Sequence, residues 1–228
     1  MIERARIIGF AGGPESGKTQ LALRTLLQLR DHAAWVCAHD PHGDMPDRLY
    51  DGTRIPLHRV SSTTRLLYRL NSKGFRRGQQ PIHVLESSSP TRLVHELMKL
   101  SSPDAPGVVL VDELGMGKQA SRHRLGELLG EVIAARRHNC LTVLWGAQFL
   151  RQVHYAAISQ SNYMVCARMK DKSDLSRLKE GGVDSDVIDI IRELPDHKFV
   201  TVPILGKGYE PAILPNPIDA GRPRPTEP

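Results

Sequence analysis

Short apolar runs alternate with amphipathic segments along most of the 228-residue chain. Apolar runs of strand length predict strands at 5–12, 33–40, 53–60, 81–86, 107–114, 140–148, 163–169 and 198–204. Apolar residues at helical spacing predict helices at 18–30, 62–72, 90–101, 119–137, 150–159, 172–180 and 184–193. This alternation predicts an α/β fold, in which helices cover both faces of a mostly parallel sheet.

The C-terminal segment departs from this pattern. Residues 211–228 carry six prolines, which predict an extended tail without a regular element. Residues 1–210 are long enough for one domain with a substantial core. We therefore expect a single α/β domain over 1–210 followed by a tail.

Charge and composition limit the class of protein. The net charge of +6 favours a polyanionic partner without establishing one. The cysteines Cys37, Cys140 and Cys166 each lie inside an apolar run, as expected of buried residues in a reducing compartment. We expect no leader sequence, because the charged residues of MIERAR run directly into the first predicted strand. No apolar stretch approaches the ~20 residues of a membrane span. We expect a cytoplasmic protein with no membrane span of its own.

A glycine-rich motif follows the first predicted strand and precedes the first predicted helix. It reads GGPESGKT and fits the phosphate-loop pattern G-x-x-x-x-G-K-[ST]. Glycines let the backbone curl around an anion, and the N-terminus of the following helix adds its positive dipole end. Lys18 would reach the β- and γ-phosphates of ATP, and the Thr19 hydroxyl would ligate Mg²⁺. The predicted nucleotide-binding residues are Gly12, Gly13, Pro14, Glu15, Ser16, Gly17, Lys18 and Thr19.

Two further predicted strands end in polar side chains. The run VVLVDE places Asp112 and Glu113 at the carboxyl end of a buried strand, the edge at which open α/β sheets bind ligands. There Asp112 would hold Mg²⁺ through water, and Glu113 would act as general base on the attacking water. Gln148 ends the next strand, LTVLWGAQ, and would bind the γ-phosphate or that water as a sensor.

The order of these motifs resembles the FtsK–HerA superfamily of DNA-pumping ATPases. The resemblance covers residues 5 to about 205 and includes ARRHN, SQSNYMVCARM and EGG downstream of the acidic strand. It implies a RecA-like (ASCE) P-loop NTPase fold. In that fold Lys18 would bind the phosphates and Thr19 the Mg²⁺. Asp112 would bind the metal, Glu113 would activate the water, and Gln148 would be the sensor. Small single-domain members are the genome-packaging ATPases of tailless viruses with an internal membrane. We expect neither the N-terminal barrel nor the C-terminal DNA-reading domain of cellular members, which leaves the cellular roles in doubt.

The resemblance also implies partners. We expect the protein to form a homo-oligomeric ring, a pentamer or a hexamer, on double-stranded DNA. The ring would lie in the host cytoplasm or be associated with the virion. A portal or capsid-vertex protein is a further candidate partner. Such motors complete their site with an arginine from the neighbouring subunit. Arg137 and Arg168 are the candidates, followed by Arg136, and each could equally be a surface or helix-end arginine.

Two basic clusters are candidate DNA contacts, because a pump that works on any sequence must contact phosphates. Such clusters are more often simply solvated surface. The residues are Lys73, Arg76, Arg77, Lys118, Arg122 and Arg124.

Other interpretations stay open. His39, Asp40, His42 and Asp44 could suggest a metal site, but no further cluster completes a ligand set, and a loop after a strand is favoured. A P-loop kinase or phosphotransferase acting on a small molecule is the first alternative function, disfavoured by the Asp-Glu pair. A filamentous-phage-type assembly ATPase is the second, although such proteins normally carry a membrane span.

Overall fold

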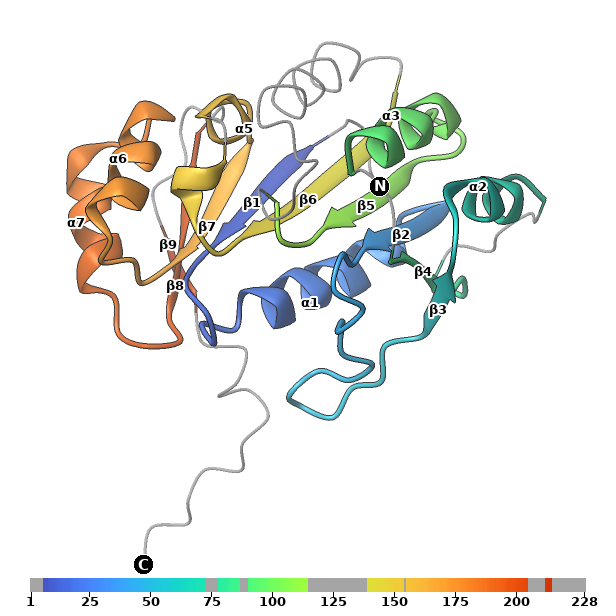
Figure 1. Ribbon diagram of the computed structural model, residues 1–228, viewed down its shortest axis with the longest axis horizontal. Helices are drawn as coiled ribbons and strands as arrows, with labels where there is room; N and C mark the ends of the chain where they lie inside the picture. The colour runs from blue at the N-terminus through green and yellow to red at the C-terminus, as the bar shows by residue number, and fades with distance from the viewer. Residues whose placement is uncertain are drawn as a thin grey trace, which may run out of the picture.

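A computed structural model describes residues 6–72, 78–86, 90–114, 139–153, 155–204 and 212–214. Nine strands form one sheet, in the order β3-β4-β2-β5-β6-β1-β7-β8-β9 (Figure 1). The strands are β1 Ile7–Ala11, β2 Trp35–His39, β3 Leu57–Val60, β4 Ile82–Leu85, β5 Gly107–Val111, β6 Leu141–Ala147, β7 Tyr163–Ala167, β8 Phe199–Pro203 and β9 Ala212–Leu214. All pairs from β3 to β7 are parallel, and β8 and β9 are added antiparallel. The predicted mostly parallel α/β sheet is confirmed.

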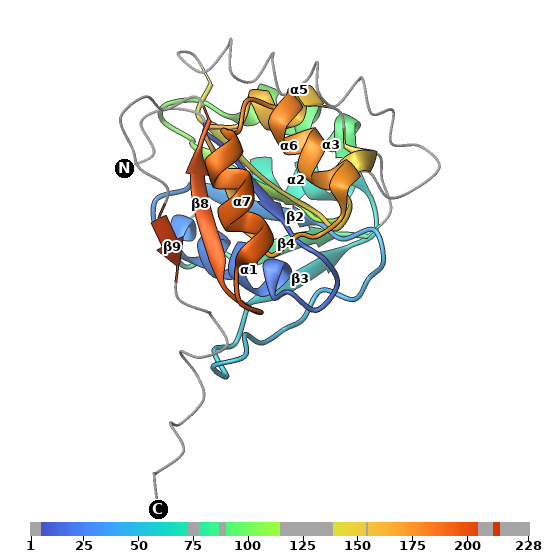
Figure 2. The ribbon, with the colours of Figure 1, turned by 90° about the vertical axis from the view of Figure 1, so that its left-hand side faces the viewer.

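The helices lie between the strands, as predicted. They are α1 Lys18–Arg30, α2 Thr63–Ser72, α3 Pro90–Leu100, α5 Tyr155–Ser159, α6 Lys172–Glu180 and α7 Ser185–Glu193, with a 3₁₀ turn η2 at Leu150–Gln152. Figure 1 shows α1 on one face of the sheet and α2, α3 and α5 on the other. In Figure 2, α7 runs beside β8 at the antiparallel end of the sheet. The predicted helix at 119–137 lies outside the described residues.

Two hydrophobic clusters, one on each face, account for this layering. On one face Leu23 and Leu26 of α1 pack with Val108 and Leu110 of β5. On the other face the apolar sides of α2, α3, α5, α6 and α7 pack on the alternate residues of the same strands. Because β2 and β5 are buried on both faces, they read as continuous apolar runs in the sequence.

Three expectations for individual elements need correction. The strand predicted at 53–60 is restricted to Leu57–Val60, because Arg54 bridges instead to Arg48 in the preceding loop. The helix predicted at 150–159 is divided into η2 and α5. Val153 adopts an extended backbone there, and the backbone N–H of Arg151 donates to Asp174 of α6 at 2.8 Å.

The segment from Pro211 was expected to form no regular element, but Ala212–Leu214 forms β9 against β8. Three residues between prolines can pair at a sheet edge, where a missing N–H donor is tolerated. No helix within the described residues is long and apolar enough to cross a membrane.

Candidate nucleotide-binding site

The phosphate-loop residues connect β1 to α1 at the carboxyl edge of the sheet. Gly17 immediately precedes α1 with a φ of 87°, a left-handed conformation that favours glycine. No side chain caps this end of α1, so the first N–H groups of the helix remain available to an anion. Gly12 also has a steric role, since a Cβ there would lie 2.7 Å from the Cβ of Ala167 in β7. The predicted order of strand, glycine loop and helix is therefore present.

The strand order brings the acidic strand to this loop. β6 lies between β1 and β5, so the carboxyl ends of all three strands meet at one edge. Asp112 and Glu113 follow β5, and Gln148 follows β6. One strand, β6, therefore lies between the strand that precedes the phosphate loop and the strand that precedes the two carboxylates.

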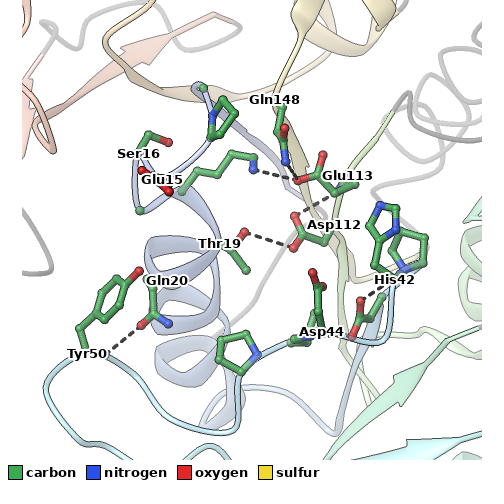
Figure 3. A pocket seen from close by; sticks show the side chains of 18 residues that line it. Glu15, Ser16, Thr19, Gln20, His42, Asp44, Tyr50, Asp112, Glu113 and Gln148 are labelled. Atoms are coloured by element: carbon green, nitrogen blue, oxygen red, sulfur yellow. Dashed lines mark hydrogen bonds and ion pairs between the residues drawn. The ribbon is translucent and has the colours of Figure 1, made fainter.

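Glu113 makes the central contacts of the site. Its Oε1 accepts a hydrogen bond from Lys18 Nζ at 2.9 Å and one from Gln148 Nε2 at 2.7 Å (Figure 3). Its backbone has a φ of 53°, which is uncommon for a residue with a side chain and typical of functional positions. The second oxygen, Oε2, is buried and has no hydrogen-bond partner among the described residues. The carboxylate is thus held by one oxygen, and the hydrogen-bonding capacity of its other, buried oxygen is unused within the described residues.

Asp112 and Thr19 form the second contact between the loop and the acidic strand. Thr19 Oγ1 donates to Asp112 Oδ2 at 3.2 Å, and Asp112 Oδ1 accepts from the backbone N–H of Glu113 at 3.0 Å. Burial raises the pKa of the Asp112 carboxyl, and the Glu113 charge adds to this effect, whereas the Lys18 ammonium opposes it.

This pair fits the ligands that Mg²⁺ requires. Mg²⁺ takes hard oxygen ligands, and in nucleotide sites it uses one or two protein groups together with phosphates and water. The Thr19 hydroxyl and the Asp112 carboxylate supply two such oxygens on one side of the pocket. A divalent cation would also offset the charge of a carboxylate whose burial disfavours ionisation.

These side chains line a pocket of about 430 Å³, large enough for a nucleotide. Its other wall is the loop after β2, which includes Asp40, His42 and Asp44; a loop was expected at these residues, but not its position beside the nucleotide pocket. Asp40 organises this loop by accepting the backbone N–H groups of Gly43 at 2.9 Å and Met45 at 2.8 Å. The part of the structure that is described holds no group of three or more His, Cys, Asp or Glu side chains arranged for a metal ion.

Sequence reasoning did not single out five residues that also line this pocket: Gln20, Pro41, Met45, Pro46 and Tyr50. Gln20 follows the phosphate-loop motif directly, and its Oε1 accepts the backbone N–H of Tyr50 at 2.9 Å. The only signal in the sequence was the position of Gln20 beside Thr19. No pattern predicted the return of residues 40–56 along α1.

The arginine candidates differ in what the structure says of them. Arg168 follows β7, is partly exposed and forms an ion pair with the exposed Asp196 in the loop after α7. It does not line the nucleotide pocket of its own chain. Arg136 and Arg137 lie outside the described residues, and so do all six candidate DNA contacts: Lys73, Arg76, Arg77, Lys118, Arg122 and Arg124.

Comparison with known proteins identifies the fold. No protein-family model matches the sequence, and no curated protein sequence gives a significant match. Among solved structures, the genome packaging NTPase B204 from Sulfolobus turreted icosahedral virus 2, in complex with ATP-gammaS, is similar with a TM-score of 0.67 at 14% identity, over 92% of this chain and 96% of that one. The DNA-packaging ATPase B204 from Sulfolobus Turreted Icosahedral Virus gives 0.60 at 12% identity, over 91% and 96%.

The monomer form of the pCW3 conjugation coupling protein TcpA, with ATPgS, gives a TM-score of 0.52 at 14% identity, over 93% of this chain and 60% of that one. The expected resemblance to packaging ATPases is therefore confirmed for the fold. The chain has the same fold as these NTPases.

Proposed function

We propose that this protein hydrolyses ATP and uses the energy to move double-stranded DNA, as a genome-packaging motor does. The hydrolytic part rests on one observation above the others, the position of Glu113. A carboxylate beside the phosphate loop, with one oxygen held by Lys18 and Gln148 and the other without a partner in the described residues, is arranged to activate water. Transfer to a metabolite would not need a base directed at water.

Each residue has a distinct task in this mechanism. The loop from Gly12 to Thr19 and the N-terminus of α1 would bind the triphosphate, and Lys18 would neutralise charge on its terminal phosphates. Glu113 Oε2 would accept a proton from the attacking water while Gln148 holds the carboxylate in place. Bound through Thr19 and Asp112, Mg²⁺ would supply charge neutralisation at the β- and γ-phosphates. The products are ADP and phosphate.

Two general properties of the chain, its fold and its net charge, support DNA as the substrate that the protein moves. The fold is that of packaging NTPases over nearly the whole chain, and the chain carries a net charge of +6. Assembly into a ring is part of the proposal, because a pump must enclose or track its substrate and because an arginine supplied by a neighbour would complete the site. Because proteins of one fold can have different functions, the proposal depends on the residues of the site as well as on the fold.

The proposal is tested by measuring ATP hydrolysis with and without duplex DNA, together with the particle mass. Hydrolysis should rise on addition of duplexes of unrelated sequence, and log K for DNA binding should fall linearly with log[salt], with a slope of about −0.9 for each phosphate neutralised. Replacing Arg76 and Arg77 together should weaken all duplexes alike and flatten that slope by up to about two. A γ-phosphate transferred to a small molecule, with no response to DNA, would identify a phosphotransferase instead.

A further inference from the structure

Tyr50 is an exposed aromatic residue held on a rigid turn at the edge of the nucleotide pocket. The residue is 57% exposed and lines the pocket together with Gln20. Hydrophobic burial does not explain an aromatic residue in this position, since Leu49 beside it already anchors the turn in the core under α1. The ring presents an open face that a planar partner could cover.

The backbone around Tyr50 is fixed from both sides. Gln20 Oε1 accepts the Tyr50 N–H at 2.9 Å, and Gln20 Nε2 donates to the Arg48 carbonyl at 3.4 Å. The turn is closed by the Leu49 N–H bonded to the Thr53 carbonyl at 2.9 Å. Arg24 of α1 donates to Asp51 at 2.6 Å, so the turn is joined to α1 at two points. Little conformational entropy remains to be lost when a ligand contacts the ring.

The direction of a bound nucleotide follows from the site already described. The γ-phosphate must lie near Glu113 and Gln148, because those side chains serve the attacking water. The nucleoside must then extend away from them, past Thr19 and over the N-terminal turn of α1. In Figure 3, Glu113 and Gln148 lie at one end of the pocket, while Gln20 and Tyr50 lie at the other, with Thr19 between.

We propose that the Tyr50 ring stacks on the base of the bound nucleotide, and that Gln20 positions it by holding the backbone of the turn. This inference rests on the proposed nucleotide site and adds the residue that recognises the base. The loop after β2 would then contact both ends of the substrate, since Asp44 lines the same pocket nearer to Asp112 (Figure 3). Stacking requires only a π-face, so it would contribute affinity for a base rather than choice among bases.

The test separates the base from the phosphates. Binding of Mg²⁺–AMPPNP and of Mg²⁺–tripolyphosphate is measured by calorimetry for the wild type and for Tyr50→Ala. Tyr50→Ala should weaken AMPPNP binding by about tenfold, the order expected for one base–aromatic stack, and leave tripolyphosphate binding unchanged. Tyr50→Phe keeps the ring and should bind both as the wild type does. Equal loss of both ligands, no loss of either, or a Phe variant that behaves like Ala would each overturn the proposal.

Two controls keep the outcome interpretable. Tyr68→Ala removes another exposed tyrosine, 73% exposed on α2, and should change neither affinity. Lys18→Ala should weaken both ligands, and if it weakens neither, the nucleotide site itself is wrong, whatever Tyr50 does. If Tyr50→Ala fails to fold, Tyr50→Trp provides a second measurement, because Trp35 and Trp145 are buried. The fluorescence of the introduced indole should change with AMPPNP and not with tripolyphosphate, and the same response to both would contradict stacking.

Discussion

Lys18 and Glu113 form a buried ion pair across the nucleotide pocket, with Nζ 2.9 Å from Oε1 and the two side chains 7% and 9% exposed. The residues are 95 positions apart in the sequence and belong to the phosphate loop and the acidic strand. The pair therefore connects the group proposed to bind the phosphates with the group proposed to activate water. Because each charge is removed from solvent, each is stabilised by the opposite charge of the other residue.

Replacing Glu113 by glutamine should separate nucleotide binding from hydrolysis. The amide keeps an oxygen that accepts from Lys18 but cannot take a proton from water, so turnover should fall by about 10²–10⁴-fold while ATP still binds. Single-turnover hydrolysis and ATP binding are measured on the same preparation. Normal hydrolysis by this variant would show that the base is another group.

The ion pair also makes a prediction for stability. Lys18→Ala leaves the Glu113 carboxylate buried without its cation, which should lower the free energy of unfolding by up to about 3 kcal/mol. Lys18→Ala combined with Glu113→Gln removes both charges and should recover part of that loss. Denaturant unfolding of the two single variants and the double variant measures the coupling. Strictly additive effects would contradict an energetic link between the two residues.

Asp112 should make stability depend on pH in the direction opposite to a carboxylate whose pKa is lowered by an ion pair. Because burial raises its pKa, the folded protein favours the neutral form, and this contribution to stability is lost as pH rises from about 4, the ordinary value, through the raised pKa. Asp112→Asn is neutral throughout and can still face Thr19 and the Glu113 N–H. Measured without Mg²⁺, it should match the wild type near pH 4 and unfold at a higher temperature at pH 7–8.

The same variant should lose activity. Without its carboxylate the site binds Mg²⁺ less well, and Mg²⁺-dependent hydrolysis should fall by about 10- to 100-fold or more. If Asp112→Asn is more stable and less active than the wild type, the Asp112 carboxylate is needed for activity and not for stability. Asp112→Asn that is less stable than the wild type at pH 8 would contradict the assigned cause of the pKa shift.

Gly146 of β6 leaves the space that the Asp112 carboxylate occupies, because glycine has no Cβ. A Cβ at this position in β6 would lie 2.7 Å from Asp112 Oδ1, closer than real contacts allow, and the residue has no positive φ that would itself require glycine. Gly146→Ala should therefore move the carboxylate and raise the Mg²⁺ concentration needed for half-maximal hydrolysis, by about tenfold. A titration with Mg²⁺ at saturating ATP measures this, and an unchanged Mg²⁺ requirement would mean that Asp112 does not act on the metal.

The sequence predicted the elements of this site better than the contacts among them. Periodicity located β1, β5 and β6, and parallel strands necessarily bring Asp112, Glu113 and Gln148 to one edge. Which oxygen of Glu113 is held and which is left without a partner depends on side-chain packing that no spacing encodes. The return of residues 40–56 along α1 was equally invisible, because Leu49 and Ile55 are buried by α1 rather than by a periodic pattern of their own. β9 was missed because the prolines that flank it dominate the local composition.

Arg168 is placed where it could act on the nucleotide of a neighbouring subunit. Arg168 is partly exposed at the carboxyl edge of the sheet. Within the described residues, its one ion-pair partner is the exposed Asp196. A surface ion pair of this kind is weak, so little free energy is needed to release Arg168. If it reaches the γ-phosphate of an adjacent copy, Arg168→Ala should lower turnover with little effect on ATP binding, and activity per subunit should rise with protein concentration. Arg177→Ala on α6, which also removes a paired surface arginine, is the matched control and should leave turnover unchanged.

Mixing variants decides whether Arg168 acts in trans. Lys18→Ala subunits retain Arg168, and Arg168→Ala subunits retain the phosphate-binding lysine, so a mixed ring contains some sites with both groups. Equal mixtures should therefore recover activity that neither variant shows alone, and the recovered activity should fall on dilution as rings dissociate. The same mixture with Arg137→Ala in place of Arg168→Ala tests the other candidate. Recovery with Arg137→Ala alone would assign the trans arginine to Arg137. Full activity of Arg168→Ala in isolation would leave Arg168 as a surface residue held by Asp196.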